Sequence, residues 1–187
     1  MNKLTFALLL LSTSLVSCAP QWYTVKKSVV DKKTGAVLAA PTGWKFMELE
    51  NRILITPDSP DLGLLVFQVL PVSKPMKFTK QIIQKNMLPE DLAALVTDNY
   101  QLNQELTQFK ILENSPEVLA GTEGFRLISE YKSGDGNPMK MLTVGMSQQD
   151  NAIVFEFAAP KRVYFDKYKP EIEAIISKFK ISPEQKK

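Results

Sequence analysis

The segment Gly63–Leu70 is the strongest constraint on the fold, because it is apolar at almost every position. Its length and its content of Leu, Val and Phe predict a β-strand, in which successive side chains point to opposite faces. Leu64, Val66 and Leu70 would share one face, and Leu65, Phe67 and Val69 the other. A strand that is apolar on both faces must be covered on both sides. The sequence therefore predicts a sheet that lies between two layers.

Further strands are predicted where apolar and polar residues alternate, or where short apolar runs are bounded by turns. These segments are residues 36–40, 52–56, 109–113, 122–132, 139–147 and 152–158. Asp150–Asn151 predicts a tight hairpin turn between the last two, because both residues tolerate positive φ. Asn114–Pro116 is expected to end the strand over residues 109–113. Gly145 is expected to let a helix approach the sheet closely.

Helical spacing of apolar residues predicts a pair of helices between the early and late strands, over residues 78–87 and from Pro89 to about Gln104. Pro89 suits a first turn, since its missing N–H would have no helical partner there. A third helix is predicted over residues 166–180, with Asp166 as its candidate cap. Its buried stripe follows the i, i+3, i+4, i+7 pattern: Ile172, Ile175, Ile176 and Phe179.

Strands, a helix pair, more strands and a final helix predict one α+β domain over residues 36–181. The economical arrangement is an α/β/α sandwich, in which a mainly antiparallel sheet has helices on both faces. Trp44 and Phe46 are expected to close one end of its core. Residues 182–187 are expected to form a polar tail.

The amino-terminal segment has the layout of a signal peptide that ends in an acylation signal. Lys3 precedes an apolar stretch, Leu4–Val16, which is too short for a membrane span of about 20 residues. Leu15-Val16-Ser17-Cys18 then resembles the lipobox of bacterial lipoproteins, and Cys18 is the sole cysteine. The resemblance implies cleavage after residue 17 and acylation of Cys18. The alternative is an ordinary secretory signal in which Cys18 is incidental.

An acylated Cys18 would hold the protein on a membrane of the cell envelope, because each buried methylene of the acyl chains contributes about 0.8 kcal/mol. Ala19 stands where Asp favours inner-membrane retention in enteric bacteria, so the outer membrane, facing the periplasm, is the favoured location. Residues 18–35 are expected to be the acylated cysteine and a flexible tether. Its lysines either attract anionic headgroups, at about 1 kcal/mol each, or are simply solvated.

Composition excludes several function classes. Lysine and arginine number 23 and aspartate and glutamate 20, a balance that argues against nucleic-acid binding. There is no histidine, and Cys18 is used by the anchor. A disulfide within the chain, a cysteine nucleophile, a Ser-His-Asp triad and zinc sites built on His or Cys are therefore excluded.

Two sets of residues are candidate metal ligands, and both have simpler explanations. The loop acids Asp58, Asp61 and Asp135 lack the spacing of an EF-hand and fit ordinary turn chemistry. Met139, Met141 and Met146 lack the His or Cys ligands expected at a copper site, and are interpreted as strand filling. No metal and no cofactor is expected.

Four short motifs resemble the PsbP-like/Mog-like superfamily: Pro41-Thr42-Gly43-Trp44, Glu123-Gly124-Phe125-Arg126, Phe165-Asp166-Lys167-Tyr168 and Ser177-Lys178-Phe179. This superfamily includes PsbP of photosystem II, its cyanobacterial lipoprotein relatives, the Ran-binding Mog proteins and the enterobacterial DcrB-like envelope lipoproteins. The resemblance implies an α/β/α sandwich without known catalysis that docks on other proteins. It carries over no binding residue, so the ligand-binding residues are unknown.

Two candidate sites remain open. Glu156 lies in an apolar strand; it is either a catalytic carboxylate of raised pKa or, in the favoured interpretation, a partner of Lys140 or Arg126, or solvent-exposed at a sheet end. The aromatic residues before the last helix form either a ligand patch or, as spacing and resemblance favour, core packing against the sheet edge. They are Tyr164, Phe165 and Tyr168.

The leading functional hypothesis is a lipid-anchored, non-enzymatic envelope protein that binds or helps assemble another envelope complex. In a cyanobacterial host, that complex would be photosystem II. The alternative is a binding module for a lipid or small apolar ligand, which predicts a closed apolar cavity of roughly several hundred Å³ under the helix pair. A hydrolase built on carboxylates would need two convergent acids in a cleft, and the sequence indicates no such pair.

Overall fold

The computed structural model describes residues 21–181, and within this range the chain forms eleven strands and two α-helices. In chain order they are β1 (Tyr23–Thr24), β2 (Val29–Val30), β3 (Ala36–Leu38), β4 (Lys45–Leu49), β5 (Arg52–Thr56), β6 (Leu64–Pro71), α1 (Pro89–Gln101), β7 (Thr107–Leu119), β8 (Thr122–Lys132), β9 (Pro138–Gln148), β10 (Asn151–Pro160), α2 (Tyr164–Ser177) and β11 (Lys180–Ile181). Eight of these described strands form an antiparallel sheet in the order β1-β4-β5-β6-β10-β9-β8-β7. The other three form a small sheet in the order β11-β3-β2.

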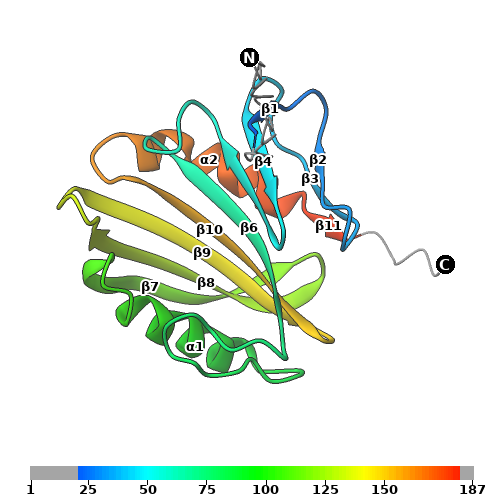
Figure 1. The fold of residues 1–187 in the computed structure, drawn as a ribbon, viewed down its shortest axis with the longest axis vertical. Helices are drawn as coiled ribbons and strands as arrows, with labels where there is room; N and C mark the ends of the chain where they lie inside the picture. Colours follow the sequence, from blue (N-terminus) through cyan, green and yellow to red (C-terminus); the bar gives the residue numbers. More distant parts are fainter. Residues whose placement is uncertain (1–20, 182–187) are drawn as a thin grey trace, which may run out of the picture.

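The two helices lie on opposite faces of the large sheet (Figure 1). One core lies on the α2 side, where Ile172 and Ile175 meet Phe67, Phe155 and other buried residues of the sheet. The other core lies on the α1 side, where Leu92 and Val96 pack with residues that include Phe125 and Leu127. The predicted α+β class and the α/β/α layering are confirmed.

Strand β6 is fully buried on one face only, whereas its sequence predicts cover on both faces. It pairs with β5 on one side and β10 on the other. Leu65 and Phe67 are fully buried in the α2-side core, whereas Leu64, Val66 and Leu70 on the other face are half-buried. The difference arises because α1 packs on β7, β8 and β9 and does not extend over β6.

The last helix has most of the predicted apolar stripe, since Ile172, Ile175 and Ile176 are buried; Phe179 is also buried but lies beyond the helix, which ends at Ser177 rather than near Lys180. It begins at Tyr164 rather than Asp166, and Pro170 lies inside it rather than in its first turn. The earlier start is explained by packing, because it seats the buried ring of Phe165 against Phe157, with ring centroids 5.5 Å apart.

The predicted helix over residues 78–87 is wrong. Lys80 and Asn86 have φ values of 62° and 54°, which an α-helix does not accommodate. The segment is an irregular excursion in which an isolated bridge joins Pro75 to Ile82. Its apolar spacing does not mark a buried face, since Ile83 is 1% exposed and its neighbour Ile82 is 52% exposed.

Residues 21–35 are not the flexible tether that composition predicts. They supply β1 and β2, and Val25 and Val29 are buried in the α2-side core. The turn between β2 and β3 is closed by the buried carboxylate of Asp31, which accepts hydrogen bonds from the backbone N–H groups of Lys33 and Thr34. The domain therefore begins at least as early as Trp22–Tyr23, and residues 1–20 and 182–187, including Cys18, lie outside the described range.

Strand β7 continues through Asn114–Pro116, where the sequence predicts its end. It is an edge strand of the large sheet, paired only with β8 among the described strands. Proline cannot donate to a ladder, but at an edge the missing N–H can face outward, so Pro116 is accommodated. The hairpin turn between β9 and β10 also differs by one residue, because Asn151 pairs with Gln148 and leaves Gln149 and Asp150 as the turn.

Gly145 makes room for an aromatic ring rather than for a helix. A Cβ atom at this position would lie 2.6 Å from Cε1 of Phe125, its partner residue on β8. The ring of Phe125 therefore covers the glycine and joins the α1-side core.

Within residues 21–181, neither helix is long and apolar enough to cross a membrane.

The buried stripe of α2 can be tested by Ile175→Asp. Ile175 is 1% exposed, so the substitution places a carboxylate in the α2-side core without a partner, which we expect to cost about 3–5 kcal/mol. Thermal unfolding followed by circular dichroism should show an unfolded domain or a melting temperature lowered by 10 °C or more, on the order expected for such a loss. Ser177→Asp, at an exposed site of the same helix, is the control; equal melting temperatures for both variants would contradict this packing.

Candidate functional site

The α1 face of the sheet carries a groove, because α1 covers only the β7–β9 half of that face. The groove encloses about 910 Å³ between α1, the irregular segment after β6, and strands β5, β6 and β10. Apolar side chains form much of its lining, among them Leu64, Val66, Leu70, Val96, Met141 and Val154. Exposed charged residues, including Arg52, Lys74 and Glu105, mark where it meets solvent.

Glu156 lies within this apolar lining. It sits on β10 between Val66 of β6 and Thr143 of β9. Tyr100 of α1 donates a hydrogen bond from its Oη to the Glu156 carboxylate, and the same Oη lies 3.4 Å from Thr143 Oγ1. The helix and the sheet are thus joined by a partly buried polar contact at the edge of the groove.

The predicted partners of Glu156 are wrong. Arg126 pairs with residues on the opposite face of the sheet, and the Lys140 ammonium lies 5.1 Å from the ring centroid of Phe165. Tyr100 could be placed on the buried stripe of a helix from sequence, but its meeting with Glu156 depends on how α1 crosses the sheet. Sequence reasoning therefore identified the carboxylate and missed the phenol.

Burial raises the pKa of Glu156, because removal from water disfavours the ionised form. The hydrogen bond from Tyr100 and the positive charge of Arg52 oppose this shift without cancelling it. Burial, followed by the nearby Glu156 carboxylate, also raises the pKa of Tyr100 well above its ordinary value. The pKa of Tyr131, which lines the same groove, is raised to about 12 by the same two causes.

This arrangement suits binding better than bond-breaking chemistry. The groove offers a wide apolar wall, a carboxyl group that is easily protonated, and phenol and amide groups that can hydrogen-bond. Acid-base hydrolysis needs a second carboxylate convergent with the first. Among the described lining residues, Glu50 and Glu105 are exposed, whereas Glu156 is engaged with Tyr100.

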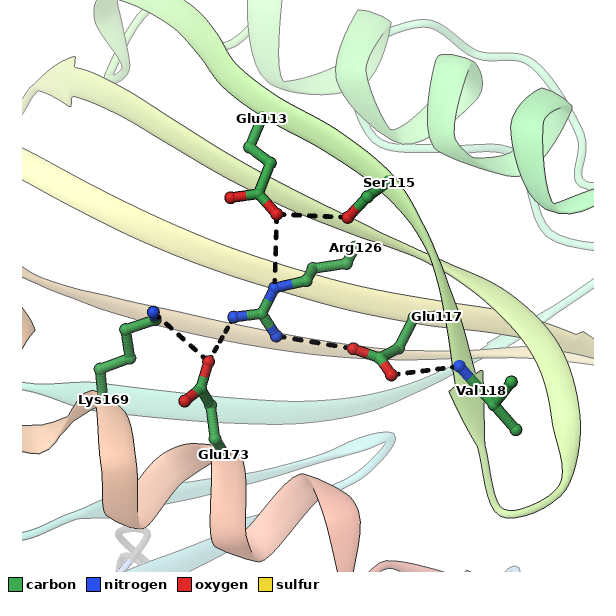
Figure 2. A network of polar contacts seen from close by, with 7 residues as sticks. All are labelled: Glu113, Ser115, Glu117, Val118, Arg126, Lys169 and Glu173. Atoms are coloured by element: carbon green, nitrogen blue, oxygen red, sulfur yellow. Dashed lines mark hydrogen bonds and ion pairs between the residues drawn. The ribbon is translucent and has the colours of Figure 1, made fainter.

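A second polar cluster lies on the α2 face and is centred on Arg126 of β8. Figure 2 shows its guanidinium surrounded by Glu113 and Glu117 of β7 and Glu173 of α2. Arg126 Nε is 3.9 Å from Glu113 Oε1, Nη1 is 3.6 Å from Glu117 Oε2, and Nη2 contacts Glu173 Oε1 more closely. Lys169 Nζ lies 3.5 Å from the same Glu173 oxygen.

The Arg126 cluster ties three elements together. Glu113, Ser115 and Glu117 alternate along β7 and so share a face, which the sequence analysis missed because it ended this strand at residue 113. The cluster gathers three carboxylates, but a cation stands among them, so each is paired. Because the glutamates are partly exposed, each pair contributes about 1 kcal/mol or less, and the cluster serves to orient α2 against the β7–β8 edge.

The loop acids do not form a metal site with one another. Asp58 accepts a hydrogen bond from the Tyr168 hydroxyl, and its Oδ2 lies 3.7 Å from Lys167 Nζ. Asp61 belongs to the turn before β6, where its N–H donates to Ser59 Oγ. Across residues 21–181, no group of three or more His, Cys, Asp or Glu side chains is placed to hold a metal ion.

The remaining sequence candidates contribute to the cores. Met141 is buried on the α1 side and Met146 on the α2 side, so the two sulfurs are separated by the sheet. Phe165 and Tyr168 are buried in the α2-side core, as predicted, and Tyr164 packs against it. Trp44 stands edge-on to Tyr168, with ring centroids 6.4 Å apart, and helps close this end of the core.

No protein-family model matches this sequence, and no curated protein is significantly similar to it. Solved structures are similar at low sequence identity. Cyanobacterial PsbP (CyanoP) from Synechocystis sp. PCC 6803 has a TM-score of 0.58 at 15% identity, over 90% of this chain and 96% of that chain. The Ran-binding protein Mog1p of Saccharomyces cerevisiae has a TM-score of 0.56 at 14% identity, over 85% of this chain and 96% of that one.

A third similar structure is LpqN, described as involved in cell envelope biogenesis of Mycobacterium tuberculosis. It has a TM-score of 0.54 at 14% identity, over 88% of this chain and 92% of that chain. At these identities the similarity establishes the fold, which is PsbP/Mog-like as the sequence motifs suggest.

The burial of Glu156 makes a prediction about stability and pH. Its folded pKa lies above the unfolded value of about 4.3, so the stability linked to this proton is present below that pH and is lost as pH rises through the raised pKa. Glu156→Gln keeps an acceptor for Tyr100 and removes the ionisation. We expect the variant to melt at a higher temperature than the parent at neutral pH, with the difference shrinking in acid.

Thermal unfolding measured across mildly acidic to neutral pH checks this expectation. Glu123→Gln, at an exposed site on β8, provides the control for loss of one carboxylate. A Glu156→Gln protein that is less stable than the parent at neutral pH would show that the ionised carboxylate is favourable in its groove.

Proposed function

We propose that this protein is a lipid-anchored, non-enzymatic component of the cell envelope whose domain binds or helps assemble another envelope protein. Acylation at Cys18 would hold it at a membrane surface, with the outer membrane, facing the periplasm, favoured by Ala19. Cys18 and the signal segment lie outside the described residues, so this part of the proposal rests on the sequence.

The observation that carries the binding role is the half-covered α1 face. Apolar surface of this kind, continuous with the core and rimmed by charged side chains, is typical of a surface that receives a partner. The occupant proposed is an apolar segment of a partner protein, seated along β6 and β10 beside α1. Mog1p, described as a Ran-binding protein, and LpqN, described as involved in cell envelope biogenesis, share the fold and make such a role reasonable by analogy.

A small apolar or lipid ligand is the second candidate, and the volume of the groove favours it. Ligand pockets usually measure roughly 300–1,000 Å³, and this groove falls within that range. It lies beside α1 and is bounded by exposed residues, which differs from the closed cavity expected under a helix pair. In a cyanobacterial host, photosystem II would be the partner to test first.

The anchor is tested by Cys18→Ser. Without the thiol, no lipid can be attached, and we expect the protein to move from the membrane fraction to the soluble envelope fraction. Ser17→Ala, which keeps a small residue before the cysteine, should leave the protein on the membrane. Mass spectrometry of the mature amino terminus gives an independent readout; an unmodified Cys18 would disprove the anchor.

The groove is tested by photo-crosslinking in living cells. A photoreactive residue replaces Val66, which lines the groove, or Ala94, which is exposed on α1. We expect a protein adduct from position 66 and none from position 94. Ala158→Trp places a large side chain in the groove and should abolish the adduct from position 66. An adduct with a lipid or other small molecule would favour the second candidate, and equal crosslinking from both positions would contradict a site in the groove.

A further inference from the structure

We propose that the flank formed by β1, β2 and the residues between them is a docking surface for an anionic lipid bilayer. The surface consists of the exposed side chains of Tyr23, Lys26, Lys27, Val30 and Lys32. The inference rests on the proposed anchor at Cys18, and adds which face of the domain meets the membrane and which lipids favour it.

The length of chain outside the described range places this flank near the bilayer. Tyr23 is fixed in β1 by its pairing with Phe46 of β4. It is the fifth residue after Cys18, and an extended chain spans about 3.3–3.6 Å per residue, so the reach is about 18 Å. Roughly 5–8 Å of this crosses the headgroup layer above the acyl chains. The first strand therefore lies within about a dozen ångströms of the lipid surface.

Both strands of the flank are at edges, so nothing in the described chain covers them from outside. β1 is the first strand of the large sheet, and β2 is the outer strand of the small one (Figure 1). Tyr23 is 52% exposed and Val30 is 46% exposed. An exposed tyrosine and valine beside lysines match the chemistry of a membrane interface, where amphipathic rings sit at headgroup level and lysines extend outward.

The charge of the flank favours anionic lipid. Lys26, Lys27 and Lys32 are exposed, whereas the single acid of residues 21–35, Asp31, is buried. Its carboxylate accepts hydrogen bonds from the backbone N–H groups of Lys33 and Thr34 and from the Thr34 hydroxyl. Glu48 and Glu50 lie at the end of β4 opposite Lys45, which pairs with Thr24, so they are away from Tyr23; at that end the Lys33 ammonium donates to the Glu50 backbone carbonyl.

This orientation leaves the groove free. Strands β4 and β5 stand between β1 and the part of the sheet that carries Glu156. A bilayer against the flank therefore does not cover the α1 face, which can still receive a partner.

The test uses acylated full-length protein in vesicles of phosphatidylethanolamine and phosphatidylglycerol. Because the acylated Cys18 has no free thiol, a cysteine introduced by Val30→Cys can be labelled uniquely with an environment-sensitive fluorophore. Val118→Cys, 66% exposed on the opposite edge strand, is the matched position. With headgroup-quencher lipids, we expect the label at position 30 to lose most of its fluorescence and the label at position 118 to keep it.

Charge reversal separates the flank from the anchor. In K26E/K27E/K32E, quenching at position 30 should disappear while the protein still floats with vesicles. K80E/K85E/R162E, with the same change of charge at exposed sites outside both the flank and the groove, should behave as the parent. In the Cys18→Ser background, the first variant should weaken binding to phosphatidylglycerol vesicles by roughly tenfold or more.

The outcomes are distinct. Flotation with equal quenching at positions 30 and 118, or quenching that survives K26E/K27E/K32E, overturns the docking surface and leaves the anchor intact. If the parent protein is not acylated and does not float, the proposed function is contradicted. The docking surface then also fails, because it depends on the short connection between an acylated Cys18 and Tyr23.

Discussion

The structure depends on keeping both faces of the central strands away from water. Strands β6, β9 and β10 carry apolar side chains on both of their faces. A single covering layer would therefore leave half of these side chains exposed. Helix α2 and the small sheet cover one face, and α1 covers part of the other. The sheet therefore lies between two covering layers, with one core on each of its faces.

The cover on the second face is incomplete, and the candidate site results from that mismatch. Helix α1 packs on β7, β8 and β9, while β5, β6 and β10 extend past it. Glu156 lies at the boundary of this cover and accepts a hydrogen bond from Tyr100 of the helix. The hydrogen bond satisfies both polar groups of this partly buried pair, beside the apolar wall of the groove. The resulting groove has an apolar wall with Glu156 at its boundary and exposed charged residues at its rim.

Residues 21–35 belong to the folded domain, and this limits how far the domain can lie from Cys18. Because Val25 and Val29 are buried in the core, the chain between the acylation signal and the domain is too short to act as a long spacer. The backbone that carries the lysines of this segment is consequently part of the folded domain. The effect of these lysines on a membrane would depend on the orientation of the domain as well as on their number.

The sequence by itself determined the elements whose signal is local and strong. The apolar strand at Gly63–Leu70 and the helical stripe of Ile172, Ile175 and Ile176 each depend on neighbouring residues. Only the tertiary structure decided which residues meet across elements. Tyr100 reaches Glu156, Arg126 gathers Glu113, Glu117 and Glu173, and residues 78–87 avoid the helix that their spacing suggests. Such contacts depend on crossing angles and strand registers, which no short stretch of sequence encodes.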